Sequence, residues 1–277
     1  EWPFDAAQGK ADGKATYPRA FMRADELATY KECLSGLLGE KLKKNCAMLS
    51  GVPFAQSAYD YFARFGLPAL INAALCVPTQ SHHSCCDVGP LMARTDDVLA
   101  CPDLPADDRR ELRARLALVA YLYTDPDVTG QGDGVHTGNP NMSMARQLWV
   151  SAAIAMLPDH PMYAAWLKYM AEFTEFKLAD NMAPGGGWFE PGTYHMWAYE
   201  RVMYGLFGLQ VMKAPNLERL LAYQRADSDY YMNLLTPFDS RYGARMISGF
   251  GNSATHYSGE LLQMAGLLSY SAPEQAA

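Results

Sequence analysis

Apolar residues in this chain recur at the spacing of three and four that marks one face of a helix, and this periodicity dominates the sequence. In residues 24–48, for example, Leu27, Tyr30 and Leu34 follow one another at that spacing. No convincing run of alternating β-branched residues is present, so the sequence predicts an all-α chain. Helices are expected over 24–48, 54–76 (with a break or kink at Pro68), 106–123, 142–157, 159–180, 191–212, 216–224 and 256–269, with weaker patterns over 88–100 and 227–235.

Short linkers join several of these expected helices, which favours antiparallel helix pairs. Two examples are LPDHP at 157–161 and KAPN at 213–216. If successive hairpins pack side by side, the longer breaks recur on one rim, and polar chemistry is expected there. No exact repeat is present, which disfavours a TPR or ankyrin array. The longer breaks, rich in Gly, Pro, Asn, Asp, His and Ser, fall at 77–90, 124–141, 181–190 and 236–254.

Composition sets the class of protein. The chain has 277 residues, of which 49% are hydrophobic and 19% charged, so it can bury a large core and is neither disordered nor a coiled coil. Lys plus Arg is 23 and Asp plus Glu is 30, and the net charge of 23 − 30 = −7 argues against a general nucleic-acid binder. No apolar run reaches the roughly 20 residues of a membrane span. We therefore expect a single helical domain over residues 1–277.

The six cysteines all lie within the first 101 residues. Their even number in one segment favours disulfides in an oxidising compartment, and buried free thiols are the alternative. The chain opens with EWPFDAAQGK, which has no initiator methionine and no signal-peptide pattern and so indicates a processed product. These features predict a secreted or periplasmic protein. The cysteines are Cys33, Cys46, Cys76, Cys85, Cys86 and Cys101.

The most informative break is GQGDGVHTGNPNMSMARQLW at 130–149. Four glycines free its backbone, while His136, Asn139 and Asn141 offer neutral hydrogen-bond donors. A helix is expected directly afterwards, with Asn141 or Ser143 as its N-cap. Amide N–H groups beside a helix N-terminus neutralise a carboxylate well, so one interpretation is a carboxylate-binding rim. The alternative is a capped junction between loop and helix.

A second informative segment is NMAPGGGWFEPGTYHMWAYERV at 181–202. Pro191 suits the first position of a helix, which places Tyr194 in the first turn, where the helix dipole favours a phenolate. With His195 beside it and an arginine in reach, this tyrosine forms a credible acid–base site. The alternative is an aromatic helix face packed into a core. The residues that share the helical face of Tyr194 are Trp197, Ala198 and Arg201, with Tyr199 on the adjacent stripe of His195.

An Asn-rich helix start, followed about fifty residues later by GGGWFEPGTYH, resembles the heparinase II/III-like and alginate-lyase-like polysaccharide lyases. The resemblance implies an incomplete (α/α) toroid of antiparallel helix hairpins, usually followed by a β-sandwich domain. It also implies cleavage of uronic-acid polysaccharides by β-elimination, without a metal or an organic cofactor. No β-sandwich follows within this chain, so we expect a further domain or a second chain to complete the cleft.

Two short motifs carry the residue roles that the resemblance implies. GNPN supplies Asn139 and Asn141 to bind the uronate carboxylate, and PGTYH supplies Tyr194 as acid or base. The family often has His directly after the Asn, but Pro140 stands here, so a histidine elsewhere must take that role. The catalytic set that we expect to meet in one cleft is Asn139, His136, Tyr194 and His195.

Aromatic and basic side chains near these motifs are candidates for binding an acidic polysaccharide. The aromatic content of 12% fits sugar stacking as well as core packing. Arginine pairs bidentately with carboxylates or sulfates, and salt bridges to the chain's own acids are the alternative. His256 is a candidate through its position alone, in the third rim loop at 241–260, where the last expected helix opens. The candidate binding residues are Asn141, Trp188, Trp197, Arg201, Arg241, Arg245 and His256.

The segment 79–98 holds His82, His83, Cys85 and Cys86 close together. Adjacent ligands rarely fit one tetrahedral centre, because neighbouring side chains diverge. A disulfide-tied loop or a histidine on the substrate rim is therefore favoured over a metal site. We expect neither a metal nor a cofactor.

Two other functions stay open from the sequence. A glycoside hydrolase on the same helical architecture needs two carboxylates that flank the bond, and Asp133, Glu190 and Glu260 are candidates. A non-catalytic glycan-binding domain needs no such pair. Ultraviolet absorbance separates a lyase from a hydrolase, because β-elimination leaves a conjugated C4=C5 double bond and hydrolysis does not.

Overall fold

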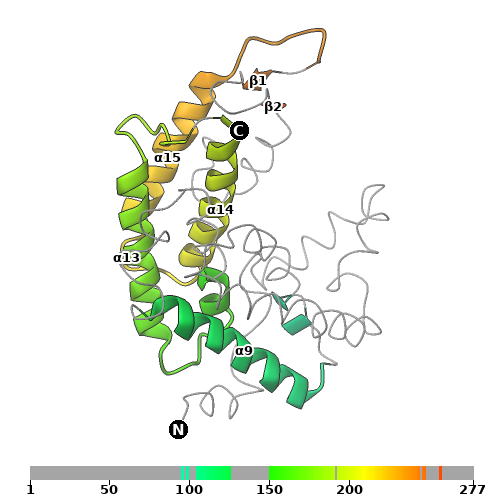
Figure 1. Ribbon diagram of the computed structural model, residues 1–277, viewed down its shortest axis with the longest axis vertical. Coiled ribbons are helices and arrows are strands. Elements are labelled where there is room, and N and C mark those ends of the chain that lie inside the picture. Colours follow the sequence, from blue (N-terminus) through cyan, green and yellow to red (C-terminus); the bar gives the residue numbers. More distant parts are fainter. Residues whose placement is uncertain are drawn as a thin grey trace. The chain divides into compact units, whose positions relative to one another are not determined.

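The computed structural model describes residues 95–96, 98–99, 104–125, 150–190, 192–243, 245–247 and 256–257 (Figure 1). These residues are mostly helical, with one pair of two-residue strands among them, which confirms the predicted all-α class. Within these ranges, no helix is both long enough and apolar enough to span a membrane. The helices expected over 24–48 and 54–76 lie outside the described residues.

The chain divides into two compact units. One comprises residues 1–131 and 149–167, and the other comprises residues 132–148 and 168–277. The boundary between residues 167 and 168 falls inside α13, which runs from Tyr163 to Asn181. Each unit therefore contains part of this helix.

In the first unit, α9 spans Ala106–Thr124, within one residue of the helix predicted over 106–123. Asp107 and Asp108 occupy its first turn, where negative charge complements the helix dipole. The helix ends at Asp125, whose backbone is extended. The buried apolar residues of α9 are Leu112, Leu116, Ala117, Val119, Ala120 and Tyr123.

Arg113 interrupts the apolar face of α9, yet its side chain is as deeply buried as the leucines around it. Its guanidinium pairs with Asp159 and lies 3.4 Å from the Met156 carbonyl oxygen, to which it donates. Both partners belong to the chain that follows the buried helical residues 150–155. The ion pair thus ties α9 to the segment that leads into α13.

α13 begins at Tyr163, four residues later than the helix predicted over 159–180. Residues 157–162 form turns instead. Within them, Nδ1 of the His160 ring accepts the Met162 N–H at 3.1 Å. A side chain that takes a backbone N–H in this way competes with helix formation, which explains the late start.

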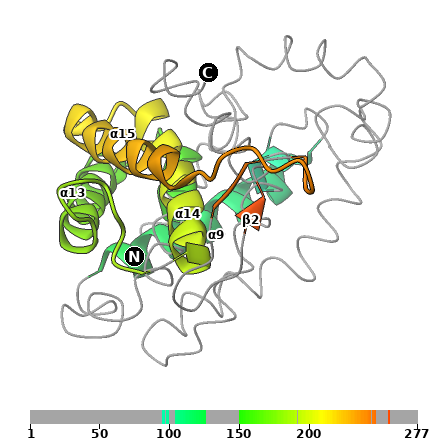
Figure 2. The same ribbon diagram turned by 90° about the horizontal axis from the view of Figure 1, so that it is seen from above.

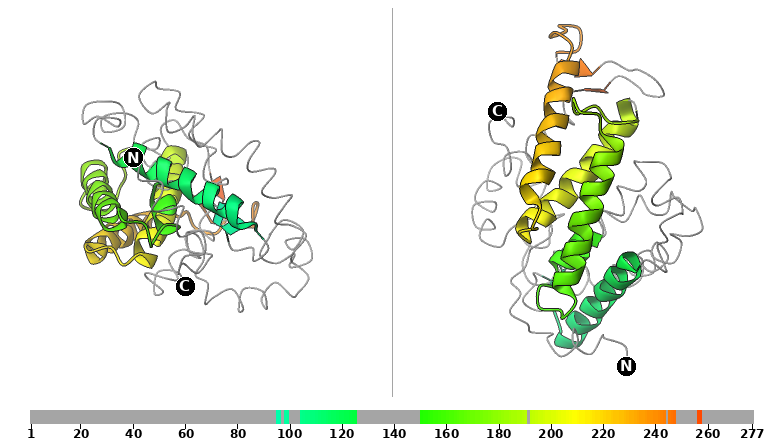
Figure 3. Two further views of the ribbon diagram at one scale, coloured as in Figure 1. Left: turned by 90° about the horizontal axis from the view of Figure 1, so that it is seen from below. Right: turned by 90° about the vertical axis from the view of Figure 1, so that its left-hand side faces the viewer.

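The second unit packs the C-terminal part of α13 with α14 (Gly192–Val211) and α15 (Leu217–Leu234), and successive helices run in opposite directions (Figures 1 and 3). Seen from above, α15 lies beside both of the other helices (Figure 2). The prediction of a helix over 191–212 is confirmed to within one residue at each end. For α14 and α15, the short linker KAPN at 213–216 had indicated such an antiparallel pair.

The turn between α14 and α15 is closed by the backbone. Lys213 has φ 58°, the left-handed conformation that usually falls to glycine after a helix. Its N–H donates to the Gln210 carbonyl at 3.0 Å, and the Ala214 N–H donates to the Leu209 carbonyl at 2.9 Å. This pair of bonds is a Schellman motif, which satisfies carbonyls that the helix end would otherwise leave open.

α15 continues to Leu234, well beyond the helix predicted over 216–224, and includes most of the weaker pattern at 227–235. The polar residues that weakened the pattern, Asp227 and Ser228, are buried. At the other end of the helix, Nδ2 of Asn216 donates to the Ala171 carbonyl of α13 at 3.0 Å. The start of α15 is therefore fixed against α13.

β1 (Met246–Ile247) and β2 (His256–Tyr257) form an antiparallel pair in which Ile247 lies opposite His256. The sequence predicted that a helix opens at His256, and this part of the prediction is wrong. Ile247 also forms an antiparallel bridge with Leu235, the residue that follows α15. This bridge stabilises the extended backbone of β1, with which His256 pairs. Two residues are too few to leave an alternating pattern in the sequence, so periodicity could not reveal the pair.

Candidate functional site

The Gly-rich break between α13 and α14 is an internally bonded loop over residues 182–190, called here the Gly-rich loop. Ala183 N–H donates to the Gly187 carbonyl at 2.8 Å, which closes the loop on itself. Phe189 N–H donates to the Asn181 carbonyl, also at 2.8 Å, which ties the loop to the last residue of α13. These two hydrogen bonds therefore fix the conformation of the loop at the end of α13.

Gly186 and Gly187 allow this loop to lie directly on α15. Gly186 has φ 88°, a conformation that side chains other than glycine rarely adopt. A Cβ at that position would lie well inside van der Waals contact with the Ala226 carbonyl and 2.8 Å from the Asp227 backbone nitrogen. A Cβ on Gly187 would meet the Tyr230 ring at 3.1 Å. These two glycines therefore serve close packing between a loop and a helix.

His195 and Asp227 form a buried hydrogen-bonded pair between α14 and α15. Nε2 of His195 lies 2.6 Å from Oδ1 of Asp227, and the two side chains are 2% and 0% exposed. Three aromatic rings pack near the imidazole, with centroid distances of 6.1 Å for Trp188, 5.9 Å for Tyr230 and 4.4 Å for Tyr231. We call these five residues the His195 cluster.

The electrostatics of this cluster centre on Asp227. Burial raises the pKa of its carboxyl above the ordinary value, and the charge and hydrogen bond of His195 oppose that rise. Within the part of the chain that the structure describes, Oδ2 of Asp227 has no hydrogen-bond partner, so the carboxyl depends on His195. Removal of that partner would leave a buried polar group uncompensated, which is costly.

Tyr194 is the third residue of α14 and so lies in its first turn, as predicted. Its side chain is half-buried, whereas that of His195, the next residue, is inaccessible. Of these two adjacent residues at the start of α14, Tyr194 is therefore the more exposed.

Trp188, a predicted sugar-binding residue, is only 8% exposed because its ring stacks on His195. Its indole N–H donates to Oε2 of Glu190 at 3.1 Å. The residue between them, Phe189, is 81% exposed, and sequence reasoning did not select it. Trp188 and Phe189 are both aromatic residues of one loop, so the sequence carries no signal that separates the buried ring from the exposed one.

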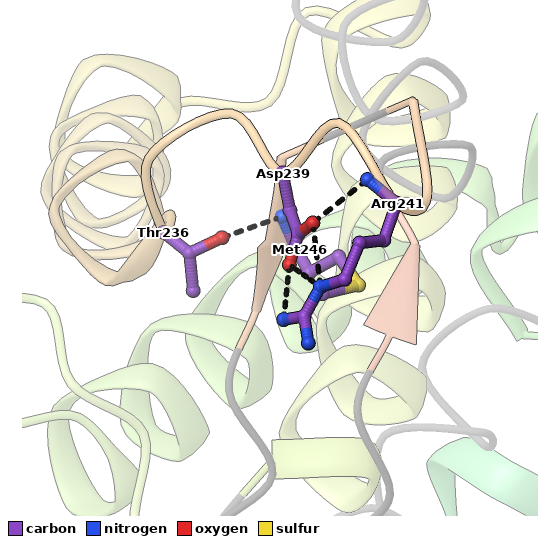
Figure 4. Close-up of polar contacts among 4 residues, drawn as sticks. All are labelled: Thr236, Asp239, Arg241 and Met246. Carbon is purple, nitrogen blue, oxygen red and sulfur yellow. Dashed lines mark hydrogen bonds and ion pairs between the residues drawn. The ribbon is translucent and has the colours of Figure 1, made fainter.

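The loop after α15 carries two predicted binding residues, Arg241 and Arg245, and both are exposed. Arg241 pairs with Asp239 in its own turn, with Nε 3.0 Å from Oδ1 and Nη2 2.7 Å from Oδ2 (Figure 4). This contact holds the pKa of the Asp239 carboxyl below its ordinary value and raises the pKa of Arg241. For Arg241, the structure thus contains the salt bridge that the sequence offered as the alternative.

Two of the long breaks come together in space. The Gly-rich loop, the first turn of α14, the end of α15 and β1 all lie at the same end of the second unit (Figures 1 and 3). The sequence predicted that long breaks share one rim, and the described parts of 181–190 and 236–254 do so. Tyr194 and the exposed Phe189 both belong to this end.

The side chains of the other predicted site residues lie outside what the structure describes. His136, Asn139 and Asn141 lie outside the described residues, so their meeting with Tyr194 stays a prediction. The same holds for the side chains of three residues whose backbone is described. These are Trp197 and Arg201 in α14 and His256 in β2.

Asp227 is the site residue that sequence reasoning missed, although the signal was present. Leu220, Gln224, Asp227 and Tyr231 follow one another at the spacing of one helical face, and all four are buried. An acidic side chain on a buried helical face needs a partner. His195, already a candidate, is that partner.

Among the described residues, no group of three His, Cys, Asp or Glu side chains is placed to hold a metal ion. Neither a family model, a curated protein nor a solved structure matches this chain. Chemically, the site offers a half-buried tyrosine next in sequence to an imidazole that a carboxylate fixes. Close by in the chain it also offers an exposed aromatic ring. Such a set can exchange a proton with a bound ligand and provide a flat apolar surface for it.

Proposed function

We propose that this chain is the helical domain of a polysaccharide lyase, which cleaves a uronic-acid-containing glycan by β-elimination. The observation that carries the proposal is the half-buried Tyr194 in the first turn of α14, followed directly by a His195 ring that Asp227 holds. The GGGWFEPGTYH motif, on which the resemblance to heparinase II/III-like and alginate-lyase-like enzymes rests, spans this same loop and turn. We further propose that the helix pairs continue into an incomplete (α/α) toroid, in a secreted or periplasmic enzyme.

The reaction removes the proton at C5 of a uronate, next to its carboxylate. The electrons of the C5–H bond form the C4=C5 double bond, the C4–O bond breaks, and the departing glycosidic oxygen takes up a proton. The C5 proton is too weakly acidic while the carboxylate keeps its full charge, so hydrogen-bond donors must stabilise the aci-carboxylate. We assign this task to Asn139 and Asn141, and each donor typically contributes about 3–4 kcal/mol of transition-state stabilisation in a dry site.

Proton transfer falls to Tyr194 in this proposal. In one route the phenolate of Tyr194 takes the C5 proton, and the phenol formed in this way then protonates the departing oxygen. In the other route His136 takes the C5 proton and the phenol of Tyr194 protonates the departing oxygen. His195 is 2% exposed and its Nε2 contacts Asp227, so we assign it to positioning and not to contact with substrate. Arg245 is exposed and is assigned to the carboxylates or sulfates of neighbouring sugars, whereas the guanidinium of Arg241 is already paired with Asp239.

Phe189→Ala should raise KM about tenfold and leave kcat nearly unchanged. We assign the ring of Phe189, which is 81% exposed, to stacking on a sugar of the substrate. Covering one face of a phenylalanine contributes about half of its full burial energy, roughly 1–1.5 kcal/mol, which corresponds to about tenfold in affinity. Steady-state kinetics measure both parameters. Phe176→Ala, which removes a ring of α13 that is 53% exposed, is the matched control and should leave KM unchanged. An unchanged KM in Phe189→Ala would exclude this contact.

A panel of polymers tests the proposed function. Alginate, heparan-type, hyaluronan-type and ulvan-type chains all present the required carboxylate, and at least one should yield new ultraviolet absorbance from the C4=C5 double bond. New reducing ends without this absorbance would indicate a glycoside hydrolase. Binding without turnover would indicate a glycan-binding domain. Either of these two results, obtained across the whole panel, would contradict the proposal.

A further inference from the structure

The pair of His195 and Asp227 lies where α14 needs an external anchor. The first turn of a helix leaves its N–H groups without intrahelical partners and frays unless neighbouring groups hold it. In α14 this turn, residues 192–195, contains no acidic residue to complement the helix dipole. His195 ends the turn and reaches Asp227, inside α15, at 2.6 Å. The pair therefore connects a weak helix end to the interior of another helix.

Rings and backbone close this contact against water. Tyr231 and Trp188 pack near the imidazole, at centroid distances of 4.4 and 6.1 Å. The Gly-rich loop, which carries Trp188, also lies so close to α15 that Gly186 has no room for a Cβ beside the Asp227 backbone nitrogen. In such a dry setting a hydrogen bond to an ionisable group is strong and directional. The orientation of the His195 ring is thus fixed, and with it the backbone that carries Tyr194.

We infer that Asp227 is a positioning residue, which acts through the His195 ring to hold the first turn of α14 and so the phenol of Tyr194. Asp227 touches no substrate in this scheme, and His195 transfers no proton. The effect on catalysis rests on the proposed function. The anchoring of the helix end does not rest on it, and so the two can be tested apart.

Hydrogen exchange followed by mass spectrometry tests the anchoring without reference to activity. Asp227→Asn removes the charge but keeps the shape of the side chain. The amides of residues 196–199, which bond to carbonyls of the first turn, should then exchange about tenfold faster than in the unmodified chain. Ser228→Ala is the matched control, because it removes a buried hydrogen bond that Ser228 Oγ donates to Gln224 within α15, and it should leave these amides unchanged. Equal exchange in Asp227→Asn and the unmodified chain would overturn the inference.

Two substitutions at His195 separate positioning from proton transfer. The amide of His195→Gln can still donate to Asp227, whereas His195→Ala cannot. On a polymer that the unmodified chain cleaves, kcat should stay within about threefold in His195→Gln and fall about tenfold or more in His195→Ala, with little change in KM. Equal loss in both variants would overturn the inference, because His195 would then act on the proton itself. This comparison also stands if Asp227→Asn does not fold.

The two hypotheses fail in different ways. If no polymer yields a double bond, the proposed function is wrong. Faster exchange at residues 196–199 in Asp227→Asn would still support the anchoring. If double bonds form but Asp227→Asn keeps the exchange and the kcat of the unmodified chain, the enzyme is a lyase and the positioning role of Asp227 is wrong.

Discussion

Tyr194→Phe should lower kcat for double-bond formation by a factor of about 100 or more, because general acid–base catalysis typically contributes at least that much. The substitution removes one hydroxyl and keeps the ring, which is half-buried in the first turn of α14. The fold and the binding of substrate should therefore persist, and KM should change little. Initial rates of ultraviolet absorbance over a range of polymer concentrations give both parameters.

The control for this experiment is Tyr223→Phe. Tyr223 is a half-buried tyrosine of α15, outside both the Gly-rich loop and the His195 cluster, and loss of its hydroxyl should leave kcat unchanged. Undiminished double-bond formation by Tyr194→Phe on every polymer that the unmodified chain cleaves would remove Tyr194 from the mechanism.

Gly186→Ala should lower the free energy of unfolding by roughly 2–5 kcal/mol, which is large for a single methyl group. Gly186 has φ 88°, and an added Cβ would overlap the Ala226 carbonyl of α15. Since backbone atoms cannot rotate away, the Gly-rich loop would have to move off the helix. Trp188 would then lose its packing on His195, so kcat should fall as well. Urea unfolding followed by tryptophan fluorescence measures the loss of stability.

Two other glycines provide graded controls. Gly185 has no atom within 4 Å of the position of an added Cβ, so Gly185→Ala should change stability by less than about 0.5 kcal/mol. Gly243 has φ 66° but open space around it, so Gly243→Ala should cost about 1–2 kcal/mol through backbone strain alone. If Gly186→Ala proves as mild as Gly185→Ala, the close packing of the loop on α15 is not what stabilises the site.

Helices in which apolar residues recur at three-and-four spacing could be predicted from the sequence. α9 and α14 lie within about one residue of their expected bounds, because three-and-four spacing reports directly on a buried stripe. The predicted helix bounds were wrong where side-chain contacts, either local or between helices, determine the backbone conformation. The His160 ring delayed the start of α13, and buried polar residues concealed the second half of α15. Neither effect is visible in a hydrophobic pattern.

The candidate site was predictable in its chain position but not in its packing. The motif placed Tyr194 in the first turn of a helix, and the structure agrees. It did not reveal that Trp188 packs inward on His195 while Phe189 is exposed, since both are aromatic residues of one loop. Asp227 is far from the motif in the sequence, and only the antiparallel packing of α14 against α15 brings it to His195.

Mass spectrometry of the cleavage products tests the central claim, β-elimination, most directly. On a polymer that the chain cleaves, each cut should produce one fragment whose new non-reducing end is lighter, by the mass of one water molecule, than a saturated fragment of the same length. The light fragments should also carry the ultraviolet absorbance of the C4=C5 double bond. Fragments that are all saturated would contradict the account, because they would show that water, and not elimination, breaks the bond.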